Sequence, residues 1–322
     1  MKATAAGVSA LSSVQAAPAA GKPTRFQIAC MTLPYSSFPL ERALQGIAAS
    51  GYKYVAWGTR HRTRGGQEAP LLDINAPPVE AKKLAGRCRD LGLTPLMMFS
   101  TIYVAADGAL DGHKKRIAQA EAAGIGQVLT FGHTEGGSYP VWIRNLRELG
   151  PIARSAGVIV VIKQHGGETG TGKDCARIVR EVGDQGVWVN YDAGNVMDYL
   201  DADPIKDIQE CVNYVRSFCI KDHRNFPTDV DCGPGFGEID HYRLLAPVSF
   251  TGLAMPLACE NISAPVVPRP QAPEGVDQLA RRAREFLETV IAGLQSGVRV
   301  QGAGVRGVQP RNIVYTSTQQ HR

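Results

Sequence analysis

Eight short apolar segments recur along this chain, and a segment with helical spacing of apolar residues lies between each one and the next. The apolar segments begin near residues 26, 54, 93, 127, 158, 187, 215 and 257. Each is rich in β-branched or aromatic residues and is bounded by polar or glycine-rich sequence, so each is predicted as a strand. Strands that alternate with helices in this way form parallel sheets.

A parallel sheet built from eight strand–helix units is predicted to close into a single (β/α)8 TIM barrel, an α/β fold. The alternative is a doubly wound open sheet, which typically has fewer strands and would leave the last units unexplained. The predicted barrel domain occupies residues 23–295.

Both ends of the chain differ in composition from the predicted barrel. Residues 1–22 are rich in small and apolar side chains after Lys2, and Ala17-Pro18-Ala19 resembles a signal-peptide cleavage site. Two interpretations stay open: the remnant of a secretory signal, which predicts export to the periplasm, or a disordered terminus of a cytoplasmic protein. Residues 296–322 are polar, glycine-rich and without periodicity, which predicts a disordered tail.

Composition and net charge limit which kinds of molecule this chain is expected to bind. Hydrophobic residues make up 44% of the chain, enough for a substantial core, and no stretch is long and apolar enough to span a bilayer. The net charge of +5 is modest and the charges are interspersed, so we expect no nucleic-acid and no membrane partner. The seven cysteines form no CxxC pair and mostly lie in apolar runs, which predicts buried free thiols.

Polar residues at the ends of four predicted strands are the candidates for chemistry. Lys163 and His165 end the strand near 158, Asp192 ends the strand near 187, His223 follows the strand near 215, and Glu260 lies in the strand near 257. Active sites of parallel α/β folds lie at the carboxyl ends of the strands. Two carboxylates and two imidazoles that meet there would suit a divalent cation.

These motifs resemble those of the xylose-isomerase-like barrels, a superfamily of sugar (phosphate) isomerases and epimerases that also contains endonuclease IV-type repair enzymes. The resemblance covers residues 26–294. It rests on AASGYKYVAWG, KQHGG, NYDAGN, IKDH with the later GFGEID, and ENI at strands two, five, six, seven and eight. It implies a metal-dependent sugar isomerase or epimerase, and pairing of barrels into a homo-oligomer.

The resemblance also implies one divalent ion held by a Glu, an Asp, a His and a Glu from strands five to eight. By position, Asp192 and Glu260 match the second and fourth of these ligands. Lys163 stands where the family has its first Glu, and Cys219 stands where the family has its His.

The strand alternation offers replacements for the two missing ligands. Side chains of a barrel strand alternate between the interior and the helix layer, so His165 shares a face with Lys163, and His223 shares a face with Cys219. The predicted ligand set is therefore Asp192, Glu260, His223 and His165, around Mn²⁺, Mg²⁺ or Zn²⁺. A Cys219 thiolate as a further ligand would favour a softer ion such as Zn²⁺.

The same resemblance assigns roles in catalysis. The family's two Glu residues act as acid and base, so Glu260 is predicted as the base that removes a proton next to a carbonyl. Lys163 is predicted either as the second proton-transfer group or as a holder of a carboxylate or substrate hydroxyl. The second role would favour a one-base isomerisation or a β-elimination on a keto-sugar. Asn195 and Lys221 are predicted substrate contacts.

One polar loop near the predicted mouth has two interpretations. The polar loop that contains Arg60 and His61 is predicted either to bind an anionic group at the same mouth or to be solvated surface.

Two alternative functions remain for the whole barrel. They are carbohydrate binding without turnover, and phosphodiester hydrolysis like that of endonuclease IV. The latter uses three metals and more His and carboxylate ligands than this sequence offers.

Overall fold

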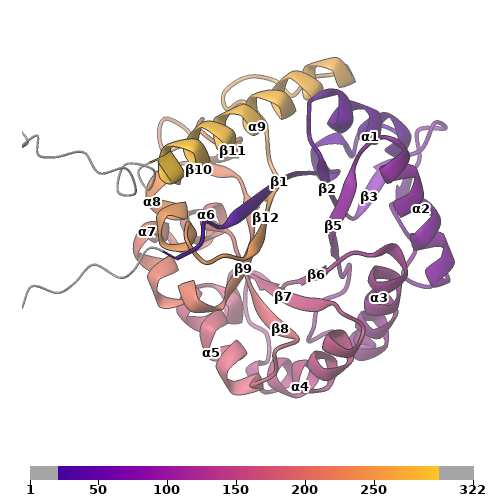
Figure 1. The fold of residues 1–322 in the computed structure, drawn as a ribbon, viewed down its shortest axis with the longest axis vertical. Helices are drawn as coiled ribbons and strands as arrows, with labels where there is room; N and C mark the ends of the chain where they lie inside the picture. The colour runs from indigo at the N-terminus through magenta and orange to yellow at the C-terminus, as the bar shows by residue number, and fades with distance from the viewer. Residues whose placement is uncertain (1–20, 297–322) are drawn as a thin grey trace, which may run out of the picture.

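The computed structural model describes residues 21–296, and its centre is a closed barrel of parallel strands. Around the ring the strand order is β1-β12-β9-β8-β7-β6-β5-β2 (Figure 1). The barrel strands are β1 (Arg25–Met31), β2 (Tyr54–Trp57), β5 (Thr94–Phe99), β6 (Gln127–Thr130), β7 (Ile159–Lys163), β8 (Val187–Tyr191), β9 (Val215–Ile220) and β12 (Ala254–Cys259). The predicted TIM barrel is confirmed, because β1 pairs with both β2 and β12 and so closes the ring.

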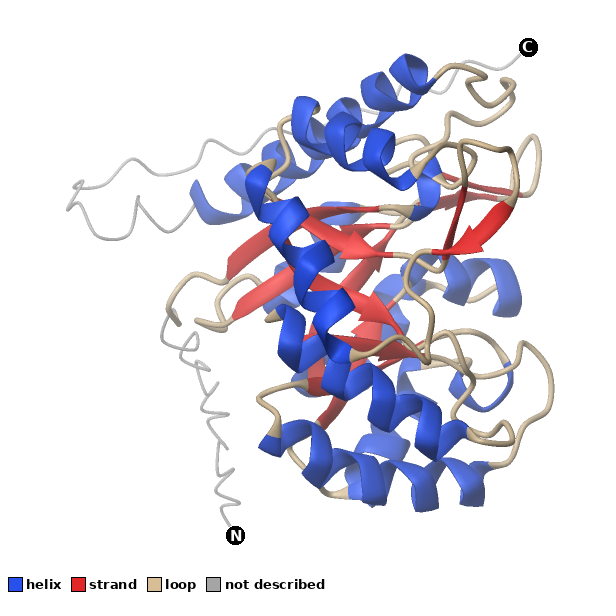
Figure 2. Cartoon of the chain, turned by 90° about the vertical axis from the view of Figure 1, so that its right-hand side faces the viewer, coloured by secondary structure: helices blue, strands red, loops and turns tan. Residues whose placement is uncertain are grey.

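Helices lie on the outside of the strands (Figure 2). They are α1 (Leu40–Ala49), α2 (Pro78–Asp90), α3 (Ala109–Ala123), α4 (Tyr139–Ser155), α5 (Gly172–Val182), α6 (Ala193–Leu200), α7 (Pro204–Asp207), α8 (His241–Leu245) and α9 (Pro273–Ser296). Short 3₁₀ helices occupy some connections: η1 (Leu33–Tyr35), η2 (Gly167–Thr169), η3 (Ile208–Glu210), η4 (Val212–Tyr214) and η5 (Ala246–Val248).

Helix α5 begins and ends at residues that favour those positions. The Thr171 hydroxyl accepts a hydrogen bond from the Asp174 backbone N–H (3.0 Å), and the Asp174 carboxylate accepts one from the Thr171 N–H (3.2 Å). This capping box satisfies N–H groups that have no partner within the helix. The helix ends at Gly183, whose φ of 68° is the left-handed conformation that glycine favours.

Two hairpins and one helix were not predicted from the sequence. Strands β3 (Arg60–Arg62) and β4 (Glu68–Pro70) form a hairpin inside the polar loop after β2. Strands β10 (Asp222–Arg224) and β11 (Val230–Cys232) form a second hairpin directly after β9. Helix α6 starts immediately after β8 and turns the chain at Asp192.

The barrel interior is mainly apolar, although it also contains the buried pair Asn190 and Ser217, whose side chains are hydrogen-bonded at 2.8 Å. Its buried apolar side chains are Ala29, Met31, Ala56, Met97, Phe99, Leu129, Val161, Cys219 and Ala258. A second, larger cluster fills the layer between the strands and the helices. The polar side chains at the carboxyl end of the barrel therefore lie next to a mainly apolar interior.

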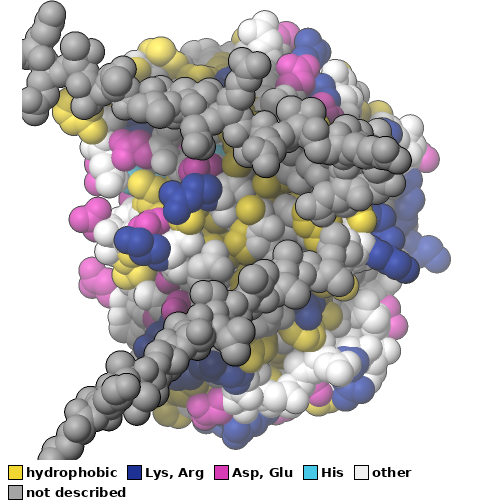
Figure 3. All heavy atoms as spheres, turned by 60° about the vertical axis from the view of Figure 1, so that its left-hand side comes forward, with side chains coloured by type: hydrophobic (Ala, Val, Ile, Leu, Met, Phe, Trp, Pro, Cys, Tyr) yellow, Lys and Arg dark blue, Asp and Glu magenta, His cyan; other side chains and the backbone are white. Residues whose placement is uncertain are grey.

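The cysteines and the surface agree with the composition. All seven cysteines are buried and free, which confirms that prediction. Within residues 21–296, no helix combines the length and the apolar character needed to cross a bilayer. Acidic and basic side chains are mixed on the described part of the face in Figure 3. Most of the predicted signal-like segment and nearly all of the predicted tail lie outside the described residues, so both stay predictions.

Candidate active site

Four barrel strands deliver charged side chains to one end of the barrel. Lys163 is the last residue of β7, and Asp192, Lys221 and Glu260 directly follow β8, β9 and β12. On β7, β9 and β12 the charged side chain lies two positions beyond an interior residue of the same strand, so it points inward by the two-residue period of a strand. Contacts among these four side chains bring them together at one mouth. Of the residues that sequence analysis placed at one mouth, Lys163, Asp192 and Glu260 belong to this cluster.

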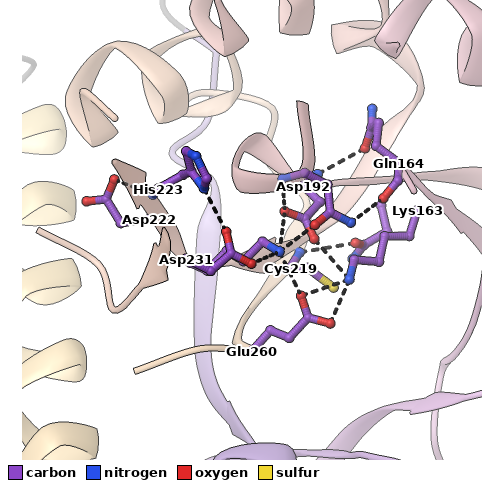
Figure 4. Close-up of polar contacts among 11 residues, drawn as sticks. Lys163, Gln164, Asp192, Cys219, Asp222, His223, Asp231 and Glu260 are labelled. Carbon is purple, nitrogen blue, oxygen red and sulfur yellow. Dashed lines mark hydrogen bonds and ion pairs between the residues drawn. The ribbon is translucent and has the colours of Figure 1, made fainter. Parts of the chain in front are cut away.

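Lys163 is the centre of the cluster. Its ammonium Nζ lies 2.6 Å and 2.8 Å from the two carboxylate oxygens of Glu260, and 3.0 Å from Oδ2 of Asp192 (Figure 4). The Lys163 side chain is 5% exposed and that of Asp192 is fully buried. A buried ammonium therefore bridges the two carboxylates that sequence analysis assigned to a metal.

Lys221 adds a second buried ammonium beside the first. It donates hydrogen bonds to Oδ1 of Asn195 and to Oδ2 of Asp231, the latter at 2.6 Å. Its Nζ also lies 4.0 Å from Asp192 Oδ1 and 3.9 Å from Glu260 Oε2. Lys163 and Lys221 together offset the charges of the two central carboxylates.

Backbone contacts fix the direction of Asp192. Its Oδ1 accepts a hydrogen bond from the Asn195 N–H (3.0 Å), which makes Asp192 the N-cap of α6. Its own N–H donates to the side-chain oxygen of Gln164 (2.9 Å), and the Asn195 side chain donates to the Gln164 carbonyl (2.7 Å). These bonds tie the end of β8 to the end of β7.

Burial and the two lysines set the charge states of the cluster. Burial raises the pKa of Asp192 to about 6, although Lys221 and Lys163 oppose this shift. Burial alone would also raise the pKa of Glu260, but Lys163 and Lys221 outweigh it and lower that pKa to about 2. Burial alone would lower the pKa of Lys163, but Glu260 and Asp192 outweigh it and raise that pKa well above its usual value. The Lys163 ammonium is therefore charged at neutral pH.

A cavity of about 330 Å³ opens onto the cluster. This volume is within the range of small-molecule sites, about 300–1,000 Å³. Glu260, both ammonium groups, Asn195 and His165 line it, and Phe38 and Ile262 are among its apolar walls. A polar ligand in this cavity would contact charged groups on one side and apolar surface on another.

His165 lines this cavity but is not part of the carboxylate cluster. Its Nδ1 lies 2.8 Å from the carbonyl oxygen of Gly132, which can only accept, so Nδ1 carries the proton. The ring packs edge-on against Phe131 and Tyr199, and burial lowers its pKa. A neutral His165 therefore leaves Nε2 as an acceptor, the form in which imidazole removes a proton.

His223 also lies away from the predicted ligand set. Its Nε2 is 3.2 Å from Asp229. Its Nδ1 is 3.0 Å from Asp231, a contact drawn in Figure 4. Neither His223 nor His165 has a ring nitrogen grouped with the oxygens of Asp192 and Glu260. The structure therefore does not assemble the predicted set of two carboxylates and two imidazoles.

Arg60 and His61 do not reach the cavity. The Arg60 side chain is exposed and pairs with Glu68 across the β3–β4 hairpin at 2.8 Å. His61 is buried, and its Nδ1 donates to the Phe38 carbonyl (3.0 Å). The exposed Arg60 agrees with the solvated-surface alternative. His61 supports the backbone of Phe38, a residue that lines the cavity.

Three residues of the cluster offer ligand atoms for the divalent ion that the resemblance implies. Asp192, Cys219 and Glu260 offer ligand atoms that lie within 4.8 Å of one another. However, the Lys163 ammonium already contacts both carboxylates, and burial raises the pKa of the Cys219 thiol well above its usual value. With the Lys163 ammonium between its two carboxylates, the cluster does not fit a divalent ion.

Asp222, the aspartate of IKDH, binds the backbone of the later GFGEID segment. Its buried carboxylate accepts hydrogen bonds from the backbone N–H groups of His223 (2.9 Å), Gly235 (2.9 Å) and Ile239 (3.0 Å). A Cβ at Gly237 would lie only 2.3 Å from Asp222 Oδ1. The motif therefore closes the loop that carries Asp231, a site residue that sequence analysis missed.

Replacement of Gly194 by alanine is expected to lower the free energy of unfolding by about 1–3 kcal/mol, the usual penalty of overpacking. A Cβ at Gly194 would lie 2.5 Å and 2.7 Å from Cε and Cγ of Lys221 and would push its ammonium out of place. The measurement is urea denaturation. Gly86→Ala in α2 is the control, because its Cβ meets nothing within 4 Å. Equal effects at the two glycines would contradict the close packing of Lys221.

The sequence itself identifies the family of this barrel. Residues 44–288 match the family model described as "Xylose isomerase-like TIM barrel", which is more than half of the chain. This chain belongs to the xylose isomerase-like TIM-barrel family. No protein with a curated description matches it.

Solved structures share this xylose isomerase-like fold at low identity. The chain is 18% identical to an L-ribulose 3-epimerase, with a TM-score of 0.63 over 86% of this chain and 98% of that one. It is 15% identical to the IOLI protein, solved with a bound zinc atom, with a TM-score of 0.65 over 84% and 99% of the two chains. It is 20% identical to a xylose isomerase-like TIM barrel/4-hydroxyphenylpyruvate dioxygenase fusion protein, with a TM-score of 0.64 over 88% of this chain, but it spans only 45% of that protein.

Proposed function

We propose that this barrel is a sugar isomerase or epimerase that transfers a proton at the carbon next to the carbonyl of a small sugar or sugar derivative. The observation that carries the proposal is the cavity that exposes Glu260 and His165 beside two buried ammonium groups. Family membership and the likeness to an L-ribulose 3-epimerase support an enzyme of this kind. The proposed partner is a sugar, and neither nucleic acid nor a membrane is part of the proposal.

The ammonium groups would stabilise the charge that forms in the reaction. Removal of a proton next to a carbonyl leaves negative charge on the carbonyl oxygen. Lys163 and Lys221 are fixed in a buried site, where preorganised positive charge stabilises such an oxygen more than it would in water. Asn195, held by Lys221 and Gln164, would orient a hydroxyl of the substrate.

Two groups in the cavity wall can exchange protons with a substrate. Glu260 is the proposed base, but in the free site its pKa of about 2 makes it a weak one. A substrate oxygen that accepts a hydrogen bond from Lys163 would weaken the Lys163–Glu260 ion pair and so strengthen the base. The neutral His165 is the proposed second group. Epimerisation needs two such groups on opposite faces of the substrate, whereas isomerisation needs one.

Proton exchange in D₂O tests this function directly. The purified protein is incubated with a panel of ketoses and keto-sugar derivatives, and NMR follows the signal of the proton next to the carbonyl. We expect this signal to be lost with the wild type and the rate to fall at least about 100-fold in Glu260→Gln, the usual size of general-base effects. Glu121→Gln, an exposed residue of α3, is the control and should exchange as the wild type does.

The second candidate function is carbohydrate binding without turnover. It is favoured by the ion pair in which both Glu260 oxygens are occupied by Lys163. Chemical-shift changes on sugar addition, without deuterium exchange for any sugar of the panel, would support this candidate and contradict the enzyme proposal.

A further inference from the structure

The mouth of this barrel contains a cation that belongs to the chain itself. We propose that the Lys163 ammonium takes the place of the divalent cation at this site, so that the native protein binds no divalent ion between Asp192 and Glu260. The inference concerns the cation rather than the reaction, and its test needs no substrate.

The Lys163 ammonium occupies the position that a divalent ion would need. Lys163 Nζ lies 2.6, 2.8 and 3.0 Å from three carboxylate oxygens, two of Glu260 and one of Asp192. A divalent ion would bind the same oxygens at about 2.0–2.6 Å. An ion and an ammonium cannot both occupy the space between these oxygens.

The charges around this position also disfavour a divalent ion. Lys163 and Lys221 face three carboxylates. Lys221 lies 2.6 Å from Asp231, and 4.0 Å and 3.9 Å from oxygens of Asp192 and Glu260. A divalent ion added to this buried cluster would leave an excess positive charge in a region of low dielectric, which is strongly unfavourable.

Few ligand groups for a divalent ion remain at this position. Structural and catalytic zinc sites have three or four protein ligands, and Mg²⁺ and Mn²⁺ prefer oxygen. Here Lys163 and Cys219 replace two ligands that the family resemblance implies, and the Cys219 thiol is buried below the carboxylates. The two carboxylates and the Cys219 thiol remain as ligand groups, and Lys163 already contacts both carboxylates.

The ammonium can perform the task that a bound cation would perform. It has three N–H donors, and in the free site these face Glu260 and Asp192. A substrate oxygen that enters the cavity can replace one carboxylate contact and receive one of these donors, while Asp192 keeps the ammonium in place. The site then presents a fixed positive charge to the substrate without a second component.

Reversal of the two substitutions is the test. Lys163→Glu/Cys219→His restores the four side-chain types of the family's ligand set while Asp192 and Glu260 stay in place. Metal content is measured by mass spectrometry after loading with Mn²⁺ or Zn²⁺ and removal of free ion, and affinity is measured by calorimetry. We expect no ion at this site in the wild type, about one equivalent in the double variant, and loss of that ion when Asp192→Asn is added.

Two controls separate this site from other binding. Lys206→Glu makes the same change of charge at an exposed position, 87% exposed in its side chain, and should gain no ion. The second group of close ligand atoms, Asp198, His223 and Asp229, lies elsewhere, so the measurements are repeated in a His223→Ala background. A wild-type protein that holds one equivalent of Mn²⁺ or Zn²⁺, lost in Asp192→Asn but not in His223→Ala, would overturn the proposal.

A simpler variant covers the case in which the double variant does not fold. Lys163→Ala removes the ammonium and leaves the two carboxylates facing an empty space. Addition of Mn²⁺ is expected to raise the melting temperature of Lys163→Ala and to leave that of the wild type unchanged, because an ion that binds only the folded state stabilises it. Equal responses of the two proteins would overturn the proposal.

Discussion

Lys163→Met is expected to lower the free energy of unfolding by about 3–5 kcal/mol at neutral pH, the usual effect of removing one partner from a buried ion pair. The variant keeps much of the apolar stem but removes the charge that holds Glu260 and Asp192 together. Two buried carboxylates would then face each other with Lys221 as their nearest cation, 3.9–4.0 Å away. Urea denaturation of both proteins across a range of pH measures the effect.

The difference between the two proteins should depend on pH with a definite sign. In the wild type the pKa of Glu260 is lowered to about 2, so its contribution to stability is complete above the unfolded pKa, about 4.3, and is lost as the pH falls toward 2. In the variant the unpaired carboxylates take up protons more readily when folded than when unfolded, so its relative stability rises as the pH falls. A constant difference at all pH values would contradict this interpretation. Lys206→Met is the control and should change stability by less than about 1 kcal/mol.

Asp222→Ala is the second variant with a large expected effect, a loss of about 3 kcal/mol or more. Its carboxylate is fully buried and accepts three backbone hydrogen bonds, so its removal leaves three N–H donors without partners. Each unsatisfied buried donor costs about 1–3 kcal/mol. The loop from β10 to α8 should also open locally, which hydrogen exchange of residues 222–239 would detect.

Asp240→Ala is the matched control for Asp222→Ala. Asp240 is exposed at the start of α8 and accepts one backbone hydrogen bond, from Arg243 (3.0 Å). Its loss should cost only about 1 kcal/mol, as for an ordinary N-cap. If the two variants lost the same stability, the carboxylate of Asp222 would not be what closes the loop. Because the hairpin holds Asp231 against Lys221, Asp222→Ala should also weaken sugar binding more than Asp240→Ala does.

The strand order and the cluster of Lys163, Asp192 and Glu260 were predictable because they depend on periodicity. Apolar runs separated by helical patterns indicate parallel strands, and the residues at the ends of such strands must converge in a barrel. The start of α6 at Asp192 was not predicted, although Asp followed by a short apolar pattern is an ordinary N-cap signal.

The two histidines were misplaced because the strand alternation was carried past the ends of the strands. Strand β7 ends at Lys163 and β9 ends at Ile220, so the backbone has already turned before His165 and His223. His165 then lines the cavity rather than the carboxylate cluster, and His223 pairs with Asp231 across a hairpin. Asp231 itself was missed because its register with His223 depends on pairing that no local pattern of the sequence specifies.

The bridge that Lys163 makes between Asp192 and Glu260 also bears on how such a site responds to its surroundings. A dissociable ion is present only as far as its concentration allows, and one metal can replace another. A charge carried by a side chain is in place once the chain has folded. Dilution does not remove it, and neither do chelators. For this barrel, the supply of trace elements would then not limit the number of working molecules. Whether this side chain is charged would depend on its protonation, and so on pH alone.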